Sequence, residues 1–292
     1  MSAIILNGSE LAKSMRPEIE TEVKAFVIEH GYAPTAAIVR AGDDPASISY
    51  SNALEKALGA RGLGFQLHKL PATASQKEIV NLVAKLNADA KVHGIMVQEP
   101  LPKGIDEAAV KEALSPDKDV DGVHPVNAGR LAQVAPTGRP PMVGHFFVPA
   151  TPAGGMEILK RNNVTLQGKH AVVVGRSNIV GKPMAFLLLR ENASVTLCHS
   201  QTADLPGMCR TADILCAAVG RASMIKGDWI KPGAVVIDFG VNFVGDKMMG
   251  DVDFNEVVNL AGMITPVPGG TGPMTNIMLM KNVIEAARRQ AE

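Results

Sequence analysis

Short apolar runs and longer amphipathic segments alternate along the whole chain. Short segments rich in apolar residues are typical of strands, and they predict strands at 34–40, 65–70, 94–98, 170–174, 194–198, 213–218 and 234–238. Apolar residues at helical spacing predict helices at 9–30, 47–61, 179–190 and 273–290. One more helix is predicted to start at Ser75, which forms a capping-box pattern with Glu78. This alternation predicts an α/β fold with largely parallel sheets.

The segment from 135 to 152 interrupts the alternation. It is rich in proline and has neither a helical nor a strand period. We therefore expect it to be a boundary that crosses a cleft between two domains. The first domain is predicted to cover 1–148 and the second 149–273, with the last helix, 274–292, packing back on the first domain to complete it.

The charge balance excludes several classes of function. The 292 residues include 29 Lys+Arg and 29 Asp+Glu, so the formal net charge is zero. A chain without a broad positive field is poorly suited to bind nucleic acid or anionic membranes non-specifically. We expect neither as a partner, and any anionic ligand must be bound by local groups.

The cysteines and the N-terminal segment predict a cytoplasmic protein. Cys198, Cys209 and Cys216 lack metal-binding spacing, and three cysteines are too few for a disulfide scaffold in a chain of this length. We expect reduced, buried thiols and no metal site. The apolar run within residues 1–15 is too short for a signal peptide, and no later window suits a membrane span.

A glycine turn in the second half is the most informative local motif. The apolar run 171–174 leads into Gly175, and Gly181 opens a helix. Backbone N–H groups and the positive end of a helix converge in such a turn, which suits a phosphate group. Ser177 replaces the middle glycine of the dinucleotide fingerprint, and Pro183 stands where a P-loop needs Ser or Thr. The alternative is an ordinary tight turn between a strand and a helix.

The next predicted strand indicates which dinucleotide the turn would accept. NAD-binding folds place an acidic residue at the tip of this strand, about 20 residues beyond the glycines, to bind the ribose hydroxyls. Here the strand ends in Cys198, His199 and Ser200, without an acid. Ser200 can donate to a ribose 2′-phosphate, and Arg176 adds a guanidinium that suits phosphate oxygens. These features favour NADP over NAD, with a solvated turn residue as the alternative role for Arg176.

The first half supplies three candidate polar groups. Tyr50 lies on a predicted helix, Gln98 ends a predicted strand, and Asp121 lies in a Lys-Asp-Val-Asp-Gly segment. Gln98 has the amide needed to orient a heterocycle, and Asp121 has a carboxylate that accepts from amino-pyrimidine nitrogens. The alternative for each is a structural role at a strand end or turn.

The sequence resembles the bifunctional methylenetetrahydrofolate dehydrogenase/cyclohydrolase family, often called FolD, over nearly the whole chain. The motifs that carry this resemblance are GDDPAS at 42–47, VQEPLP at 97–102, DVDG at 119–122, GRSNIVGKP at 175–183, CHS at 198–200, GDWIKPGA at 227–234 and TPVPGGTGPMT at 265–275. Several long motifs in one order make a chance similarity very improbable.

The resemblance implies a cytoplasmic homodimer of one-carbon metabolism and purine biosynthesis. Its first domain would bind tetrahydrofolate derivatives, and its second, Rossmann-like domain would bind NADP, with the active-site cleft between them. The family oxidises 5,10-methylenetetrahydrofolate with NADP and then hydrolyses the methenyl product to 10-formyltetrahydrofolate, without a metal. The implied cofactor-binding residues are Gly175, Arg176, Ser177, Ser200 and Val241. The implied catalytic and folate-binding residues are Tyr50, Gln98 and Asp121, with Pro268, Gly269 and Gly270 lining the cleft.

One departure from the family pattern concerns the second reaction. The family has a lysine four residues after the tyrosine, and this lysine is its central acid/base group for hydrolysis. Here that position is Leu54, which has no proton to exchange, and Lys56 is about 120° around the helix from Tyr50. Glu99 also replaces the family's usual leucine. We expect hydride transfer to be retained or altered and hydrolysis to be weak or absent.

Two other functions remain open. One is a paralogue that binds NADP or folate without turnover, which the missing lysine would explain. The other is a dehydrogenase for a different pterin or one-carbon carrier, because Leu54 and Glu99 reshape the pocket.

Overall fold

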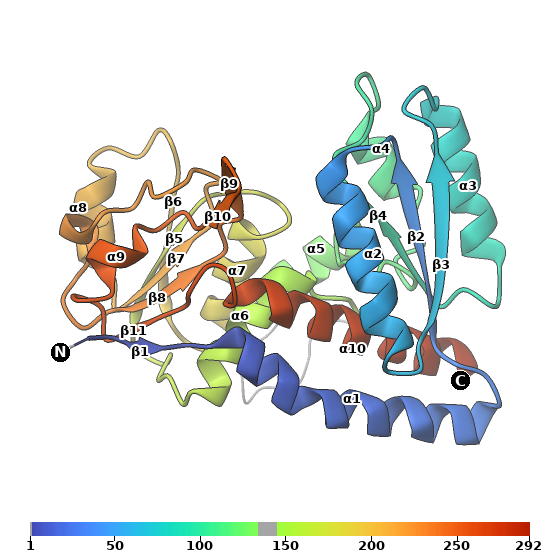
Figure 1. Cartoon of the computed structure of the whole chain (residues 1–292), viewed down its shortest axis with the longest axis horizontal. Helices are drawn as coiled ribbons and strands as arrows, with labels where there is room; N and C mark the ends of the chain where they lie inside the picture. The colour runs from blue at the N-terminus through green and yellow to red at the C-terminus, as the bar shows by residue number, and fades with distance from the viewer. Residues whose placement is uncertain (1, 134–144) are drawn as a thin grey trace. The chain divides into compact units, whose positions relative to one another are not determined.

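The computed structural model describes residues 2–133 and 145–292, which form two compact units (Figure 1). The six-stranded unit consists of the described residues of 1–14, 130–144 and 151–275. The three-stranded unit consists of 15–129, 145–150 and 276–292. Residues 135–144 of the predicted boundary segment lie outside the described part of the chain. Within the described ranges, no helix has both the length and the apolar character needed to cross a membrane.

One parallel sheet forms the centre of the six-stranded unit. Its strand order is β1-β11-β8-β7-β5-β6, and every neighbouring pair is parallel. The strands are β1 (Ile4–Ile5), β5 (His170–Val174), β6 (Ser194–Cys198), β7 (Ile214–Ala217), β8 (Val235–Asp238) and β11 (Met263–Ile264). The chain runs from β5 to β6 and then returns to β7 on the other side of β5. Ligands of open parallel sheets bind at the carboxyl ends of the strands where the order reverses in this way.

Short helices and one hairpin complete this unit. They are α6 (Ala150–Arg161), α7 (Gly181–Arg190), α8 (Leu205–Arg210), the 3-10 helix η1 (Gly227–Trp229), α9 (Phe254–Val257) and the antiparallel hairpin of β9 (Asn242–Val244) and β10 (Lys247–Met249). Apolar side chains of the sheet, such as Val172, Leu215 and Val236, form the core. All three cysteines are buried and free, as predicted.

The three-stranded unit has a smaller parallel sheet with β2 in the centre. The order is β3-β2-β4, with β2 (Thr35–Ala41), β3 (Gly64–Leu70) and β4 (Gly94–Val97). Its helices are α1 (Gly8–His30), α2 (Pro45–Gly59), α3 (Gln76–Ala88), α4 (Glu107–Glu112), α5 (Pro125–Ala132) and α10 (Thr271–Ala291), of which α1 and α10 have their first residues in the other unit. The predicted capping box is present: Ser75 Oγ accepts from the Glu78 N–H (3.3 Å) and the Glu78 carboxylate accepts from the Ser75 N–H (2.7 Å).

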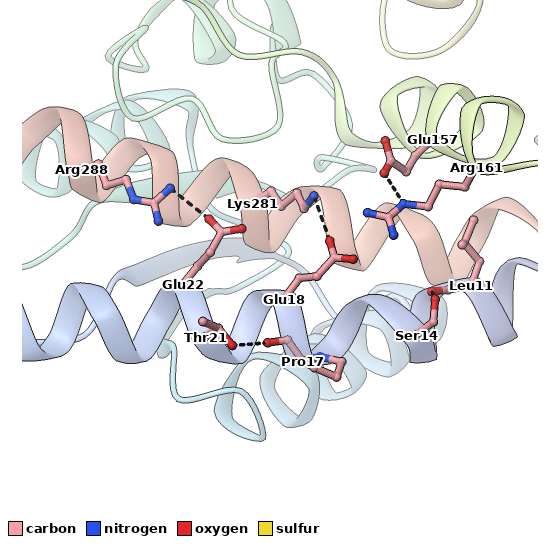
Figure 2. Close-up of polar contacts among 10 residues, drawn as sticks. All are labelled: Leu11, Ser14, Pro17, Glu18, Thr21, Glu22, Glu157, Arg161, Lys281 and Arg288. Carbon is pink, nitrogen blue, oxygen red and sulfur yellow. Dashed lines mark hydrogen bonds and ion pairs between the residues drawn. The ribbon is translucent and has the colours of Figure 1, made fainter. Parts of the chain in front are cut away.

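Each end of the chain joins segments that are distant in sequence. Strand β1 pairs with β11, so residues 1–14 group with the six-stranded unit and not with the predicted first domain. In the three-stranded unit, α10 runs alongside α1, with the ion pairs Lys281–Glu18 and Arg288–Glu22 between them (Figure 2). The two-residue pairing of β1 explains why the N-terminal bound differs from the sequence prediction.

Candidate functional site

Gln98 lies at the carboxyl edge of the three-stranded sheet, where β4 ends. Its side chain is 4% exposed, and its Nε2 donates to the Ser47 carbonyl oxygen (2.8 Å) in the first turn of α2. The Ser47 hydroxyl donates in turn to the Glu99 carbonyl (3.4 Å). These bonds fix the loop after β4 against α2. The Oε1 of Gln98 is buried without a hydrogen-bond partner among the described residues, so it is free to accept from a ligand.

The loop that carries Asp121 is held by a second, buried aspartate. Asp119 accepts hydrogen bonds from the N–H groups of Val123 (3.1 Å) and His124 (2.7 Å) and from Asn127 Nδ2 (2.8 Å). The segment also runs parallel to β4, where the Ile95 N–H donates to the Lys118 carbonyl (2.6 Å). Asp121 therefore lies two residues after the β-bridge between Ile95 and Asp119, at the same edge of the sheet as Gln98.

The electrostatics bring Tyr50, Asp121 and Glu99 together. Burial raises the pKa of Asp121 to about 7, and the negative charges of Asp119 and Glu99 contribute, while Lys111 opposes them. Burial also raises the pKa of the Tyr50 phenol, and the Asp121 charge raises it further. Glu99 forms an ion pair with Lys111 of α4. The sequence did not reveal Lys111, because no local pattern connects α4 to the loop after β4.

Leu54 occupies the position where the family pattern has its lysine. The buried face of α2 consists of Ser47, Ser51, Leu54 and Leu58, and Leu54 has no exposed surface. It lies four residues after Tyr50, so the two side chains differ by about 40° around the helix. Lys56 is exposed and two positions further on. The face of α2 next to Tyr50 therefore has an apolar side chain where an ammonium group is expected.

Arg40 is a charged residue of this region that the sequence analysis did not identify as a site residue. It lies near the end of β2 and is 6% exposed. One guanidinium nitrogen, Nη1, donates to Ser51 Oγ on α2 (2.8 Å), whereas the buried Nε has no partner among the described residues. The sequence signal that could have identified Arg40 is its position directly after the four apolar residues 36–39 of a predicted strand.

The glycine turn of the six-stranded unit follows β5, next to the reversal of strand order. Gly175 has φ +123°, and a Cβ there would overlap the Ala218 carbonyl after β7. A Cβ on Gly181 would overlap the Gly175 carbonyl. Only glycine therefore fits at either position, because the turn packs closely against the chain's own backbone.

The exposed part of this turn carries free donors. The backbone N–H groups of residues 176–179 have no hydrogen-bond partner within the described chain, while Ser177 Oγ accepts from the N–H groups of Val180 (3.1 Å) and Gly181 (3.3 Å). The Arg176 side chain is exposed, and no described carboxylate lies within 4.0 Å of it. Free N–H groups at the start of a helix, next to an unpaired guanidinium, suit a phosphate group.

Ser200 lies beside the turn, because β5 and β6 are neighbouring parallel strands. The register pairs Val174 with Cys198, and the Gly175 N–H donates to the Cys198 carbonyl (2.9 Å). Ser200 follows two residues later and is exposed. The structure thus brings Gly175 and the tip of β6 to one edge of the sheet.

Val241 and the segment 268–270 also belong to the six-stranded unit. Val241 follows β8 and is 56% exposed. The buried Asp251 fixes this edge by accepting from the N–H groups of residues 219–221 (2.6–3.0 Å) and from Asn242 Nδ2 (2.9 Å). Pro268 is exposed and Gly269 has φ +98°. Tyr50, Gln98 and Asp121 belong to the three-stranded unit. In the described ranges, no group of three or more His, Cys, Asp or Glu side chains is arranged to hold a metal ion.

Comparison with known proteins identifies the family to which both units belong. The family model described as tetrahydrofolate dehydrogenase/cyclohydrolase, catalytic domain, matches residues 6–121. The model of the NAD(P)-binding domain of the same family matches residues 149–291. The two matches follow each other along the chain in the order that the sequence motifs predicted.

Individual relatives are similar over their whole length. The bifunctional protein FolD of Roseiflexus sp. (strain RS-1) is 50% identical over 291 residues, covering 99% of this chain and 98% of the relative. The structure of FolD from Campylobacter jejuni is 38% identical, with a TM-score of 0.93 and 99% of both chains covered. FolD of Trypanosoma brucei, solved in complex with NADP cofactor and an inhibitor, is 36% identical, with a TM-score of 0.94, and the match covers 100% of this chain and 99% of that one. The chain therefore belongs to the tetrahydrofolate dehydrogenase/cyclohydrolase family.

Proposed function

We propose that this protein oxidises 5,10-methylenetetrahydrofolate to 5,10-methenyltetrahydrofolate with NADP, and that its hydrolysis of the product to 10-formyltetrahydrofolate is weak or lost. Family membership of both units supports the oxidation. The replacement of the family's lysine by the fully buried Leu54 is the observation that carries the second half of the proposal.

The six-stranded unit supplies the NADP site. The turn from Gly175 to Gly181 leaves room for the pyrophosphate, and its free N–H groups bind the phosphate oxygens. Arg176 and Ser200 bind the ribose 2′-phosphate, Ser177 closes the turn, and Val241 contacts the cofactor from the loop after β8. When bound, NADP accepts a hydride and so carries the redox chemistry.

The three-stranded unit orients the folate. Gln98 is locked by Ser47 and presents its free Oε1 to the pterin ring, while Asp121 accepts from the ring's amino group. Tyr50 keeps its proton, since burial raises its pKa, and is therefore a donor at working pH. Hydride transfer needs mainly correct placement of donor and acceptor carbons, which these groups provide.

Hydrolysis needs a group that moves protons to and from the attacking water. Leu54 has none, and Lys111 is engaged in an ion pair with Glu99. General acid/base groups contribute about 10²- to 10⁴-fold to such steps, so a loss of this size is expected for hydrolysis alone.

Two assays on the purified chain test this proposal. NADPH formation from methylenetetrahydrofolate measures the oxidation, and the decay of added methenyltetrahydrofolate measures hydrolysis. Rapid NADPH formation with slow hydrolysis supports the proposal, whereas rapid hydrolysis by the unaltered chain contradicts it. Binding of NADP without any turnover would instead favour a non-catalytic paralogue. Higher turnover with another reduced pterin would favour a different carrier.

The family resemblance also leads us to propose a homodimer in the cytoplasm. Exposed apolar side chains on the β9–β10 hairpin, Phe243 at 63% and Val244 at 55%, offer a surface suited to a partner. Light scattering should give twice the mass of 30.7 kDa. A monomer at micromolar concentration would contradict this part of the proposal.

A further inference from the structure

Arg40 carries a buried charge that the described structure does not neutralise. It is 6% exposed in the central strand β2, and no carboxylate of residues 2–133 or 145–292 lies within 4.0 Å of its guanidinium. Its side-chain partner is the neutral Ser51 hydroxyl, and its Nε is buried without a partner. Buried charges are normally paired, because removing a charge from water is costly. An unpaired guanidinium at this position therefore needs a ligand or another function.

Gln98 is the direct neighbour of Arg40 on the same face of the sheet. Strands β2 and β4 pair Val39 with Val97, and the Gln98 N–H donates to the Val39 carbonyl (2.9 Å). Residues in register on parallel strands point to the same face, so Arg40 and Gln98 lie side by side. Both reach α2, where their partners Ser51 and Ser47 are one helical turn apart.

The two side chains leave complementary hydrogen-bonding groups unused. Arg40 retains a free donor at Nε, and Gln98 retains a free acceptor at Oε1. A lactam edge, in which a ring N–H adjoins a ring carbonyl, satisfies both groups at once. The pyrimidinone ring of a reduced pterin has such an edge, and its amino group is available to Asp121 on the neighbouring segment.

We propose that Arg40 is a further substrate-binding residue, whose guanidinium donates to the pterin carbonyl oxygen while Gln98 Oε1 accepts from the adjacent ring N–H. This inference rests on the proposed function. The guanidinium provides a positive charge on the face of α2 that lacks the family's lysine. Arginine does not release its proton, so Arg40 contributes to binding but cannot replace the lysine as a base in hydrolysis.

Substitution of Arg40 separates a binding role from a structural role. Arg40→Met keeps a long side chain but removes the donors, and it should raise the KM for methylenetetrahydrofolate at least about tenfold, the range expected for a hydrogen bond to a charged group. The KM for NADP should stay within about twofold, since the cofactor residues lie on the other unit. Arg40→Lys should give an intermediate KM. A folded Arg40→Met variant with an unchanged folate KM would overturn the proposal, and would point to a buried water between Arg40 and Gln98.

A substrate analogue tests which atom Arg40 contacts. In 4-amino-4-deoxytetrahydrofolate an amino group replaces the carbonyl oxygen, so the unaltered protein should bind it at least about tenfold more weakly than tetrahydrofolate. Arg40→Met should lose this preference, whereas the control Ser51→Ala, which keeps the guanidinium, should retain it. If Arg40→Met does not fold, Arg40→Lys takes its place and should show a reduced preference. An undiminished preference in the folded Arg40 variant contradicts the proposed contact.

The same measurements distinguish this inference from the proposed function. If the unaltered chain neither oxidises methylenetetrahydrofolate nor binds tetrahydrofolate, both proposals fail. If the unaltered chain oxidises methylenetetrahydrofolate and binds tetrahydrofolate, the proposed function stands. If the Arg40 variants then have the same folate KM as the unaltered chain and the same preference for tetrahydrofolate over the 4-amino analogue, only the role of Arg40 is overturned.

Discussion

Leu54 is the residue on which we propose that the balance of the two reactions depends. It lies on the buried stripe of α2, one turn from Tyr50, and has no exposed surface. An ammonium group placed there would be partly desolvated, which lowers the pKa of a lysine and makes it a better base near neutral pH. We therefore expect the side chain at this position to determine whether protons move during hydrolysis.

Leu54→Lys should restore hydrolysis selectively. We expect methenyltetrahydrofolate hydrolysis to rise at least about tenfold, because a base is regained, while the rate of NADPH formation changes little. The buried charge should lower the free energy of unfolding by about 1–3 kcal/mol. Stopped-flow absorbance and urea denaturation measure the two effects. Leu54→Met is the matched control without a base, and equal hydrolysis by both variants would count against this role of position 54.

Burial is the main cause of the raised pKa of Asp121, and the Glu99 charge raises it further. The pKa of Asp121 is about 7, so below this pH the group gains a proton, loses its negative charge and accepts more weakly from the pterin amino group. The folate KM of the unaltered protein should therefore rise as the pH falls below about 7. Glu99→Gln removes one negative charge and lowers the pKa of Asp121, so this rise should begin at a lower pH. Lys111→Met removes the cation that lowers the pKa of Asp121, so the rise in the folate KM should begin at a higher pH. If the folate KM of all three proteins depends on pH in the same way, Glu99 and Lys111 do not influence Asp121.

At the scale of elements, we expect the neighbouring tips of β5 and β6 to determine which cofactor binds. Ser200→Asp places a carboxylate where the ribose 2′-phosphate is expected, next to the turn with Arg176. Like charges at contact cost several kcal/mol, so the KM for NADP should rise about tenfold to a hundredfold with little change in the KM for NAD. Ser200→Ala loses only one hydrogen bond and should have a smaller effect. Steady-state kinetics with both cofactors provide the test, and an equal rise for NAD would contradict it.

Elements with local signals were predictable from the sequence. The bounds of β5 and β6 agree with the prediction, because consecutive apolar residues end at Gly175 and His199. Helix α3 begins at its capping box, a pattern contained within four residues. Tyr50, Gln98 and Asp121 were identified from residue type and family motifs, and in the structure the charge of Asp121 acts on Tyr50.

Features that depend on distant segments were not predictable in this way. The short apolar run that contains Ile4 and Ile5 does not reveal that β1 pairs with β11, a segment some 260 residues away. The contact of Arg40 with Ser51 and the pairing of Glu99 with Lys111 arise only when the sheet and helices assemble. An arginine after an apolar run looks like the end of a strand until its burial is known.

For the molecule as a whole, buried carboxyl groups couple stability to pH. Asp121 keeps its proton up to about pH 7 in the folded chain but loses it near pH 4 when unfolded. Between these values the folded state binds more protons, so this group makes the free energy of unfolding fall as the pH rises. Asp238, with a pKa of about 6 owing to burial, contributes in the same direction from the other unit.

Asp121→Asn should therefore flatten this part of the pH dependence. In the unaltered chain, Asp121 makes the free energy of unfolding decrease between pH 4.5 and 7.5. The variant has no group at position 121 that titrates in this range, so its free energy of unfolding should lack this decrease. Urea titrations at several pH values measure the slope. Asp246→Asn, on an exposed turn, controls for the loss of one charge, and identical slopes in all three proteins would disprove the coupling.

The crossing of the chain ends has a consequence for biosynthesis. A ribosome makes Ile4 and Ile5 some 260 residues before their partner strand β11. The three-stranded unit also depends on a late segment, because Asn282 of α10 donates to the Val120 carbonyl (2.7 Å), next to Asp121, and α10 forms ion pairs with α1. The contacts of each unit are therefore complete only after β11 and α10 have been synthesised, and a translation product that stops before α10 would lack the hydrogen bond beside Asp121.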